Sequence, residues 1–215
     1  MKKTIKKILI FFSLINIFRK IRFLLLQLPS WPKWIILKKN KKILLEIGSG
    51  NKKGKNGWTT VDLHYGADIV HDLKKGIPLP EASVDEIYAS HVLEHISFKD
   101  LIVLLEEIYR VLKQNGKFSV CVPDASLYIE AYVAKKKFMP EVERYQPALV
   151  DTGSLMDQIQ YMAYMNQEHK YLFDKQNLVN TLKKVPFNKV ELRTFDESID
   201  MKSRDFESIY AIAIK

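Results

Sequence analysis

Short, mostly apolar runs of strand length recur along the chain, each ending in glycine, proline or polar residues. They cover residues 43–47, 58–63, 67–73, 84–89, 117–122, 189–194 and 207–214. The run at 43–47 passes directly into Gly48-Ser49-Gly50, which is typical of a buried strand followed by a tight turn.

Two amphipathic segments between these runs predict helices. Residues 98–113 repeat Leu, Ile and Val at helical spacing, with Ser97 and Asp100 in capping-box positions and Asn115-Gly116 as the expected stop. A second helix is expected from Asp174 to about Lys184. Strands that alternate with helices predict an α/β fold with a mostly parallel sheet and ligand sites at the carboxyl ends of its strands. Residues 124–170, rich in Tyr and Met, show no regular pattern.

The N-terminal segment has a different pattern. Its apolar residues surround a polar stripe, and neither apolar run reaches the roughly 20 residues of a membrane-spanning helix. We expect Pro29 and Pro32 to end the helix, and Trp31 and Trp34 to favour a lipid headgroup zone. This composition favours an interfacial helix on an anionic membrane, through residues 1–34; packing on the body or on another subunit is the alternative.

Charge separates this segment from the rest. The chain has 34 basic and 25 acidic side chains, yet residues 1–42 hold twelve of the basic ones and none of the acidic ones. The remaining 173 residues carry 22 basic against 25 acidic groups, which argues against a nucleic-acid-binding domain. We therefore expect a basic segment at 1–41, a globular domain at 42–215, and a cytoplasmic protein, peripheral on the inner membrane face. The single cysteine, Cys121, excludes an internal disulfide and is expected to be a buried, inert thiol.

The glycine turn and the acid after it suggest a ligand site. Gly48 and Gly50 follow one predicted strand, and Asp62 ends the next, where a carboxylate can accept both hydroxyls of a ribose. A dinucleotide site needs a third glycine, a full helix and a longer spacing, whereas Lys52 and a short connection stand here. A ligand with a ribose but no phosphate fits better; a tight turn without a ligand is the alternative.

Several short motifs follow one another along the chain. They are Glu46-Ile47-Gly48-Ser49-Gly50, residues 57–62, His71-Asp72-Leu73, Ile77-Pro78-Leu79-Pro80, residues 83–95, residues 110–117, Val122-Pro123-Asp124 and His169-Lys170-Tyr171. In this order they resemble the small class I S-adenosylmethionine-dependent methyltransferases, closest to bacterial members associated with cell-surface polysaccharide synthesis. The resemblance covers roughly residues 42–215 and implies a Rossmann-like, mostly parallel sheet with an antiparallel closing strand.

The resemblance also implies S-adenosylmethionine as cofactor and a role for each matching residue. Glu46, Gly48 and Gly50 are expected at the methionine end, Asp62 with Leu63 at the ribose, and Asp72 with Leu73 at the adenine. Ser90 and His91 are expected near the transferred methyl group. For a hydroxyl or amine acceptor that must lose a proton, His91, His95 and His169 are the candidate catalytic residues, and a structural role is the alternative for each.

Two shorter motifs point elsewhere. Residues 91–95 match H-x-x-E-H, the inverted zinc-protease motif, but they begin where a strand should end, so we expect no metal site. Residues 132–136 match the Tyr-x-x-x-Lys of short-chain dehydrogenases without the accompanying glycines, and a helix surface is the simpler interpretation.

The sequence thus predicts a methyltransferase whose acceptor is a glycan or lipid-linked sugar precursor bound by residues 124–170. A lipid-carried substrate stays in the plane of the membrane that the N-terminal segment would contact. Two alternatives stay open: a non-catalytic interaction module at the membrane, and a nucleic-acid methyltransferase, which the slightly acidic body speaks against.

Overall fold

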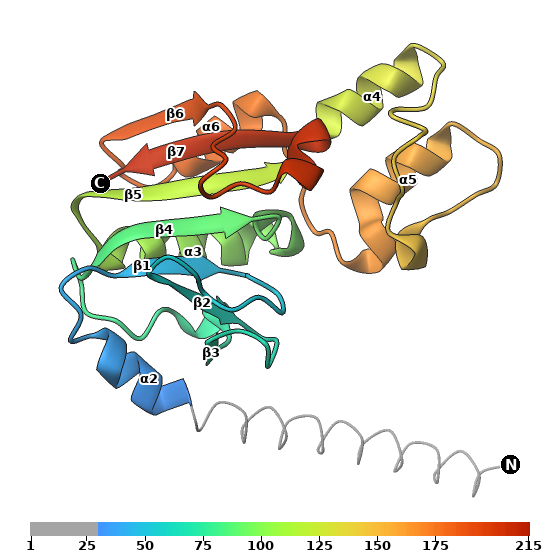
Figure 1. Ribbon diagram of the computed structural model, residues 1–215. Coiled ribbons are helices and arrows are strands. Elements are labelled where there is room, and N and C mark those ends of the chain that lie inside the picture. The colour runs from blue at the N-terminus through green and yellow to red at the C-terminus, as the bar shows by residue number, and fades with distance from the viewer. Residues whose placement is uncertain (1–29) are drawn as a thin grey trace, which may run out of the picture.

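The computed structural model describes residues 30–215 and contains a seven-stranded sheet in the order β3-β2-β1-β4-β5-β7-β6 (Figure 1). β7 runs antiparallel to both neighbours, and the other described pairings up to β5 are parallel. The strands are β1 (Leu44–Ile47), β2 (Trp58–Asp62), β3 (Ile69–Val70), β4 (Val84–Ser90), β5 (Leu112–Pro123), β6 (Lys189–Arg193) and β7 (Ser208–Ile214). This is the predicted Rossmann-like methyltransferase sheet, with the antiparallel strand in the expected place.

Helices α3 (Phe98–Val111) and α6 (Lys175–Leu182) lie behind the strands in the view of Figure 1. The predicted caps are confirmed: Ser97 Oγ accepts from the Asp100 amide, and Asp174 accepts from the Asn177 amide. The apolar face of α3 is buried against the sheet through Leu101, Leu104, Leu105, Ile108 and Val111. Between β1 and β2 the chain forms turns and no helix, as the short spacing predicts.

The end of α3 differs from the prediction. The helix stops at Val111, and Leu112 already pairs with Val84 as the start of β5. Asn115, in a left-handed conformation with φ of 63°, lies inside β5, where the register to β4 shifts before Lys117 pairs with Glu86. Asn115-Gly116 therefore forms an irregularity within a strand, and it is not the stop of the helix.

Residues 124–170 form a lobe beside the sheet, at the far right of Figure 1. It contains α4 (Ala125–Val133), α5 (Met156–Tyr164) and the single 3₁₀ turns η3 (Gln146–Ala148) and η4 (Met165–Gln167). A small core of its own holds the helices together: Ala125, Tyr128, Ala148, Tyr161 and Met162. The periodicity of the sequence did not predict these helices.

Helix α2 (Ser30–Leu37) packs on the edge of the sheet. Ser30 Oγ accepts a hydrogen bond from the Val70 amide of β3, and Trp34 is buried, with its ring edge-on to His71. Two expectations are corrected here. Pro32 does not end a helix but lies in the first turn of α2, where a proline is tolerated, and Trp34 is a core residue that no headgroup can contact.

The rest of the N-terminal prediction, the amphipathic helix up to Pro29, lies outside the described residues. Within residues 30–215, no helix combines the length and the apolar composition that a bilayer span requires.

A buried ion pair joins the closing strands to the middle of the sheet. Arg193 of β6 donates two hydrogen bonds to Asp200, whose carboxylate also accepts from the Tyr88 hydroxyl of β4 at 3.0 Å. Cys121 on β5 is buried as expected, and burial raises the pKa of its thiol to about 11, so the thiol is protonated and inert at neutral pH.

Candidate active site

A cavity of about 550 Å³ opens at the carboxyl ends of β1, β2 and β4. Eight of the nine residues that the sequence assigns to a cofactor line it, together with two of the three candidate catalytic histidines. These residues are Gly48, Gly50, Asp62, Leu63, Asp72, Leu73, Ser90, His91 and His95. The sheet topology brings them together because parallel strands end at one edge.

The glycine turn after β1 forms the floor of the cavity. Gly48 and Gly50 have φ of 65° and 63°, the left-handed region that favours glycine. A Cβ added to Gly48 would lie 2.2 Å from Cγ2 of Val92, so the turn packs tightly against the loop after β4. Ser49 is buried and lines the cavity, and its hydroxyl has no hydrogen-bond partner among the described residues.

Asp62 is held in a fixed orientation at the end of β2. Its Oδ2 accepts from the Gly50 amide at 2.8 Å, and its Oδ1 accepts from the His64 amide at 2.8 Å. Each carboxylate oxygen keeps a further lone pair for a ligand. Asp72 is fixed in a similar way, because it caps the 3₁₀ turn η1 (Leu73–Lys75) by accepting from the Lys74 amide.

Glu46 is the predicted cofactor residue that the cavity does not include. Its side chain lines a second cavity of about 380 Å³ with Trp58, Tyr88 and Ile199, and it pairs with Lys52 at 2.5 Å. Lys52, which stands where a third glycine was expected, lines both cavities.

The three candidate histidines gather around Glu94. His91 and His95 line the cavity, whereas His169 lies behind them, buried, with its ring 5.0 Å from that of His95. His91 Nδ1 is 3.8 Å and His95 Nε2 is 3.7 Å from Glu94 Oε1. Burial raises the pKa of Glu94 to about 8 and lowers that of His91 to about 3, and burial also lowers the pKa of His95 and of His169. The histidines are therefore neutral at pH 7.

Sequence reasoning missed Arg204 as a cavity residue. It belongs to η5 (Lys202–Glu207), and its guanidinium lies 3.4 Å from the Ser90 carbonyl oxygen, so it brings a positive charge into the cavity. Glu94 and Glu168, a further lining residue, were not assigned a role either. Arg204 and Glu168 stand in no motif that marks a ligand site, and Glu94 stands only in the H-x-x-E-H match at residues 91–95. The contacts of all three arise only when distant loops fold onto one strand edge.

The polar groups that line the cavity fit S-adenosylmethionine. An orphaned hydroxyl at Ser49, an oriented carboxylate at Asp62 and a positive guanidinium at Arg204 match a ligand with an amino acid end and a ribose. The glycine turn lets the ligand approach the backbone.

Comparison with known proteins supports the prediction of a methyltransferase over part of the chain. Residues 45–120 match a protein family described as a methyltransferase domain. No curated protein matches the chain.

Three solved structures with a similar arrangement are all methyltransferases. A S-adenosylmethionine-dependent methyltransferase from Archaeoglobus fulgidus is 16% identical, with 86% of this chain and 90% of that chain covered and a TM-score of 0.49. One from Aquifex aeolicus is 13% identical, with 85% and 88% covered and a TM-score of 0.48. Phosphoethanolamine N-methyltransferase 2 from Haemonchus contortus, solved with S-adenosyl-L-methionine, is 14% identical, with 88% and 52% covered and a TM-score of 0.48.

The part of the chain from β1 to β5 is therefore similar to a methyltransferase domain, and the strand order is the one expected for that fold.

Proposed function

We propose that the 550 Å³ cavity is the cofactor site and that Asp62 is its ribose-binding residue. The observation that carries this proposal is the fixed carboxylate of Asp62, which the amides of Gly50 and His64 hold inside the cavity. Gly48, Ser49 and Gly50 would contact the methionine end, Asp72 and Leu73 the adenine, and Ser90 and His91 the region of the sulfonium. Bound there, S-adenosylmethionine supplies an electrophilic methyl group, and the protein positions the acceptor in line with it.

Replacing Asp62 by Ala should weaken cofactor binding by about 1–3 kcal/mol, because two ribose hydroxyls lose their acceptor. Isothermal titration calorimetry with S-adenosylmethionine measures the effect. Asp151→Ala, at an exposed position of the lobe, is the matched control and should bind as the wild type does. A folded wild-type protein that gives no binding heat at millimolar cofactor would overturn the assignment, and so would an unchanged affinity of the Asp62 variant.

The acceptor, in this proposal, is a glycan or lipid-linked sugar precursor bound by the lobe at residues 124–170. The lobe contains a cavity of about 300 Å³ lined by Phe138, Arg144 and Tyr161, and its surface exposes Tyr145 and Tyr164. Aromatic rings combined with a guanidinium offer flat apolar faces and charge-assisted donors, which suit a polar, ring-shaped acceptor. Transfer of a labelled methyl group into the lipid-linked saccharide fraction of a membrane extract tests it; label only in protein or nucleic acid would contradict it.

The N-terminal segment would place this reaction at an anionic membrane surface. Seven basic residues and no acid stand in residues 1–29, although Trp34, which the sequence assigns to the same segment, belongs to the core. The part of α2 that faces solvent is mostly apolar, with Trp31, Ile35 and Ile36 exposed beside Lys33. These two features support a peripheral contact that combines charge and apolar area.

Deleting residues 1–29, which leaves Trp34 in place, should abolish co-flotation with vesicles that contain phosphatidylglycerol. The full chain should float with these vesicles and much less with neutral phosphatidylcholine vesicles, because the attraction is electrostatic. The truncated chain should keep the melting temperature of the full chain. A truncated protein that still floats, or that melts far earlier, would count against a docking role and for a packed segment.

A further inference from the structure

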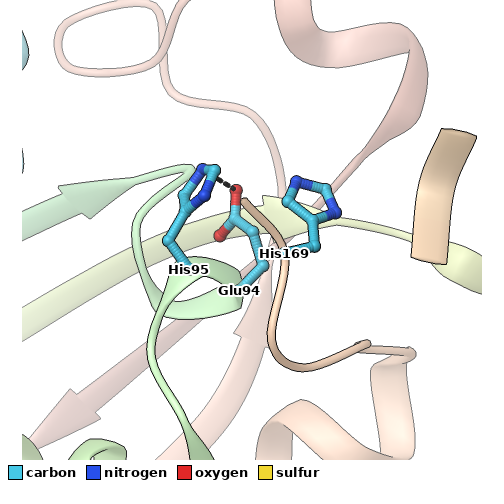
Figure 2. A group of neighbouring side chains, drawn as sticks. All are labelled: Glu94, His95 and His169. Carbon is cyan, nitrogen blue, oxygen red and sulfur yellow. Dashed lines mark ion pairs between the residues drawn. The ribbon is translucent and has the colours of Figure 1, made fainter. Parts of the chain in front are cut away.

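Three side chains converge beside the cofactor cavity: Glu94 and His95 of the turn η2 (Leu93–His95), and His169 from the loop before α6 (Figure 2). One possible ligand atom of each lies within 4.8 Å of those of the others. Glu94 is buried, and neither of its carboxylate oxygens has a hydrogen-bond partner among the described residues. We propose that this cluster, with His91 as a fourth ligand, binds a divalent first-row transition metal ion.

The hydrogen bonds of His95 and His169 leave one unprotonated nitrogen with a free lone pair on each ring. His95 Nδ1 lies 3.2 Å from the Glu168 carbonyl oxygen, and His169 Nδ1 lies 2.6 Å from that of Met162. A carbonyl only accepts, so both Nδ1 atoms carry the proton of the neutral ring, and each Nε2 keeps its lone pair. A backbone carbonyl behind the ring is also the usual partner of a metal-binding histidine.

His91 also keeps a lone pair on one ring nitrogen, because of its hydrogen bond to Ser208. Its Nε2 lies 2.9 Å from Ser208 Oγ, and the Ser208 hydroxyl donates its one proton to the Arg204 carbonyl at 2.6 Å. His91 Nε2 must therefore be the donor to Ser208, which leaves the lone pair on Nδ1, the atom that faces Glu94. The backbone of His91 has φ of 54°, an unfavourable conformation for a residue other than glycine, and such conformations are concentrated at functional sites.

Lone pairs thus meet a buried carboxyl group at this point, and a cation that displaces the proton of Glu94 would satisfy them together. Ligand atoms about 2.1 Å from a tetrahedral ion lie about 3.4 Å from each other. The 3.7 and 3.8 Å from Glu94 to His95 and His91 are within a small side-chain adjustment of that separation. Imidazoles with one carboxylate favour Zn²⁺ and its first-row neighbours over Mg²⁺ or Ca²⁺.

This assignment differs from the expectation of no metal site, and also from the helical zinc-protease arrangement. Residues 93–95 form one 3₁₀ turn, and His91 is outside it in a left-handed conformation, so the two histidines do not share a helix face. Since His91 and His95 line the cofactor cavity, the ion would lie in its wall. If the proposed function holds, the ion there would take a hydroxyl oxygen of the acceptor as a fifth ligand and favour loss of its proton to solvent.

Cobalt binding to the full, untagged chain tests the site. After treatment with EDTA, titration with Co²⁺ should produce visible absorption that saturates at one ion per chain and disappears when Zn²⁺ is added. Glu94→Gln keeps the shape but removes the charge, and it should weaken Co²⁺ binding at least tenfold. His64→Gln, at an exposed histidine outside the cluster, is the matched control and should bind Co²⁺ as the wild type does.

The outcomes separate this site from the cofactor site. Absent absorption in the wild type, or equal affinity of the Glu94 and His64 variants, would overturn the metal site and leave Glu94 as a protonated structural residue. Should the Glu94 variant fail to fold by circular dichroism, His95→Gln replaces it, because that side chain is partly exposed and tolerates the change. Calorimetry with S-adenosylmethionine on the same preparation, with and without Zn²⁺, reports on the cofactor site independently.

Discussion

Replacing Trp34 by Ala should lower the free energy of unfolding by about 3–5 kcal/mol, the usual cost of removing a large aromatic side chain from a core. Trp34 is 3% exposed, and its indole packs edge-on against His71 at a centroid distance of 5.5 Å. The cavity left behind would lie between α2 and the β3 edge, where Trp34 belongs to the same buried cluster as Leu37 and Ile69. Urea denaturation followed by tyrosine fluorescence or circular dichroism measures the loss.

Trp31 on the same helix provides the control. It is 63% exposed, so Trp31→Ala removes the same atoms without opening a cavity and should change stability by no more than about 0.5 kcal/mol. A small effect of both substitutions would mean that α2 rests only loosely on the body. The segment at 30–37 would then belong with the preceding basic residues, as the charge pattern alone suggests.

The two tryptophans show what composition can and cannot predict. The strands were predictable because burial on a sheet demands apolar runs of fixed length, and the caps Ser97 and Asp174 mark helix starts locally. The burial of Trp34 was not predictable, because neighbouring Trp31 has the same chemistry and only tertiary packing, with His71 and the core of the domain, distinguishes the two. The lobe helices α4 and α5 are short and pack on each other, so their apolar faces carry little periodicity.

The candidate site divides in a similar way. Residues that follow a strand end were predictable, since topology places all strand ends at one edge. The position of the Glu46 side chain outside this cavity was not predictable, although Glu46 lies in the same motif as Gly48. Side chains alternate along a strand, and Glu46 points away from its buried neighbours Leu45 and Ile47, beside its register partner Tyr88. Arg204 reaches the cavity from η5, a segment whose position depends on the whole sheet.

Gly48→Ala should cost about 2–5 kcal/mol of folding stability and weaken cofactor binding with it. Two effects add. A left-handed backbone costs a residue with a Cβ about 1–2 kcal/mol, and overpacking a tight contact costs about 1–3 kcal/mol more. The new Cβ would lie 2.2 and 2.7 Å from the two methyl carbons of Val92, and a valine cannot swing its methyl groups aside without moving its backbone. Both residues line the cofactor cavity, so the shift that relieves the clash would reshape it.

Gly153→Ala separates these two effects because it keeps the first and lacks the second. Gly153 also has a left-handed backbone, with φ of 82°, but a Cβ there meets nothing within 4 Å. Its replacement should cost only the backbone part, about 1–2 kcal/mol, and should leave the affinity for S-adenosylmethionine unchanged. Urea denaturation and calorimetry on both variants give the comparison. Gly48→Ala could instead lose no more stability than Gly153→Ala and bind the cofactor with the same affinity as that variant. The contact between the glycine turn and Val92 would then not shape the cavity, and the carboxyl ends of β1 and β4 would be more pliable than their packing indicates.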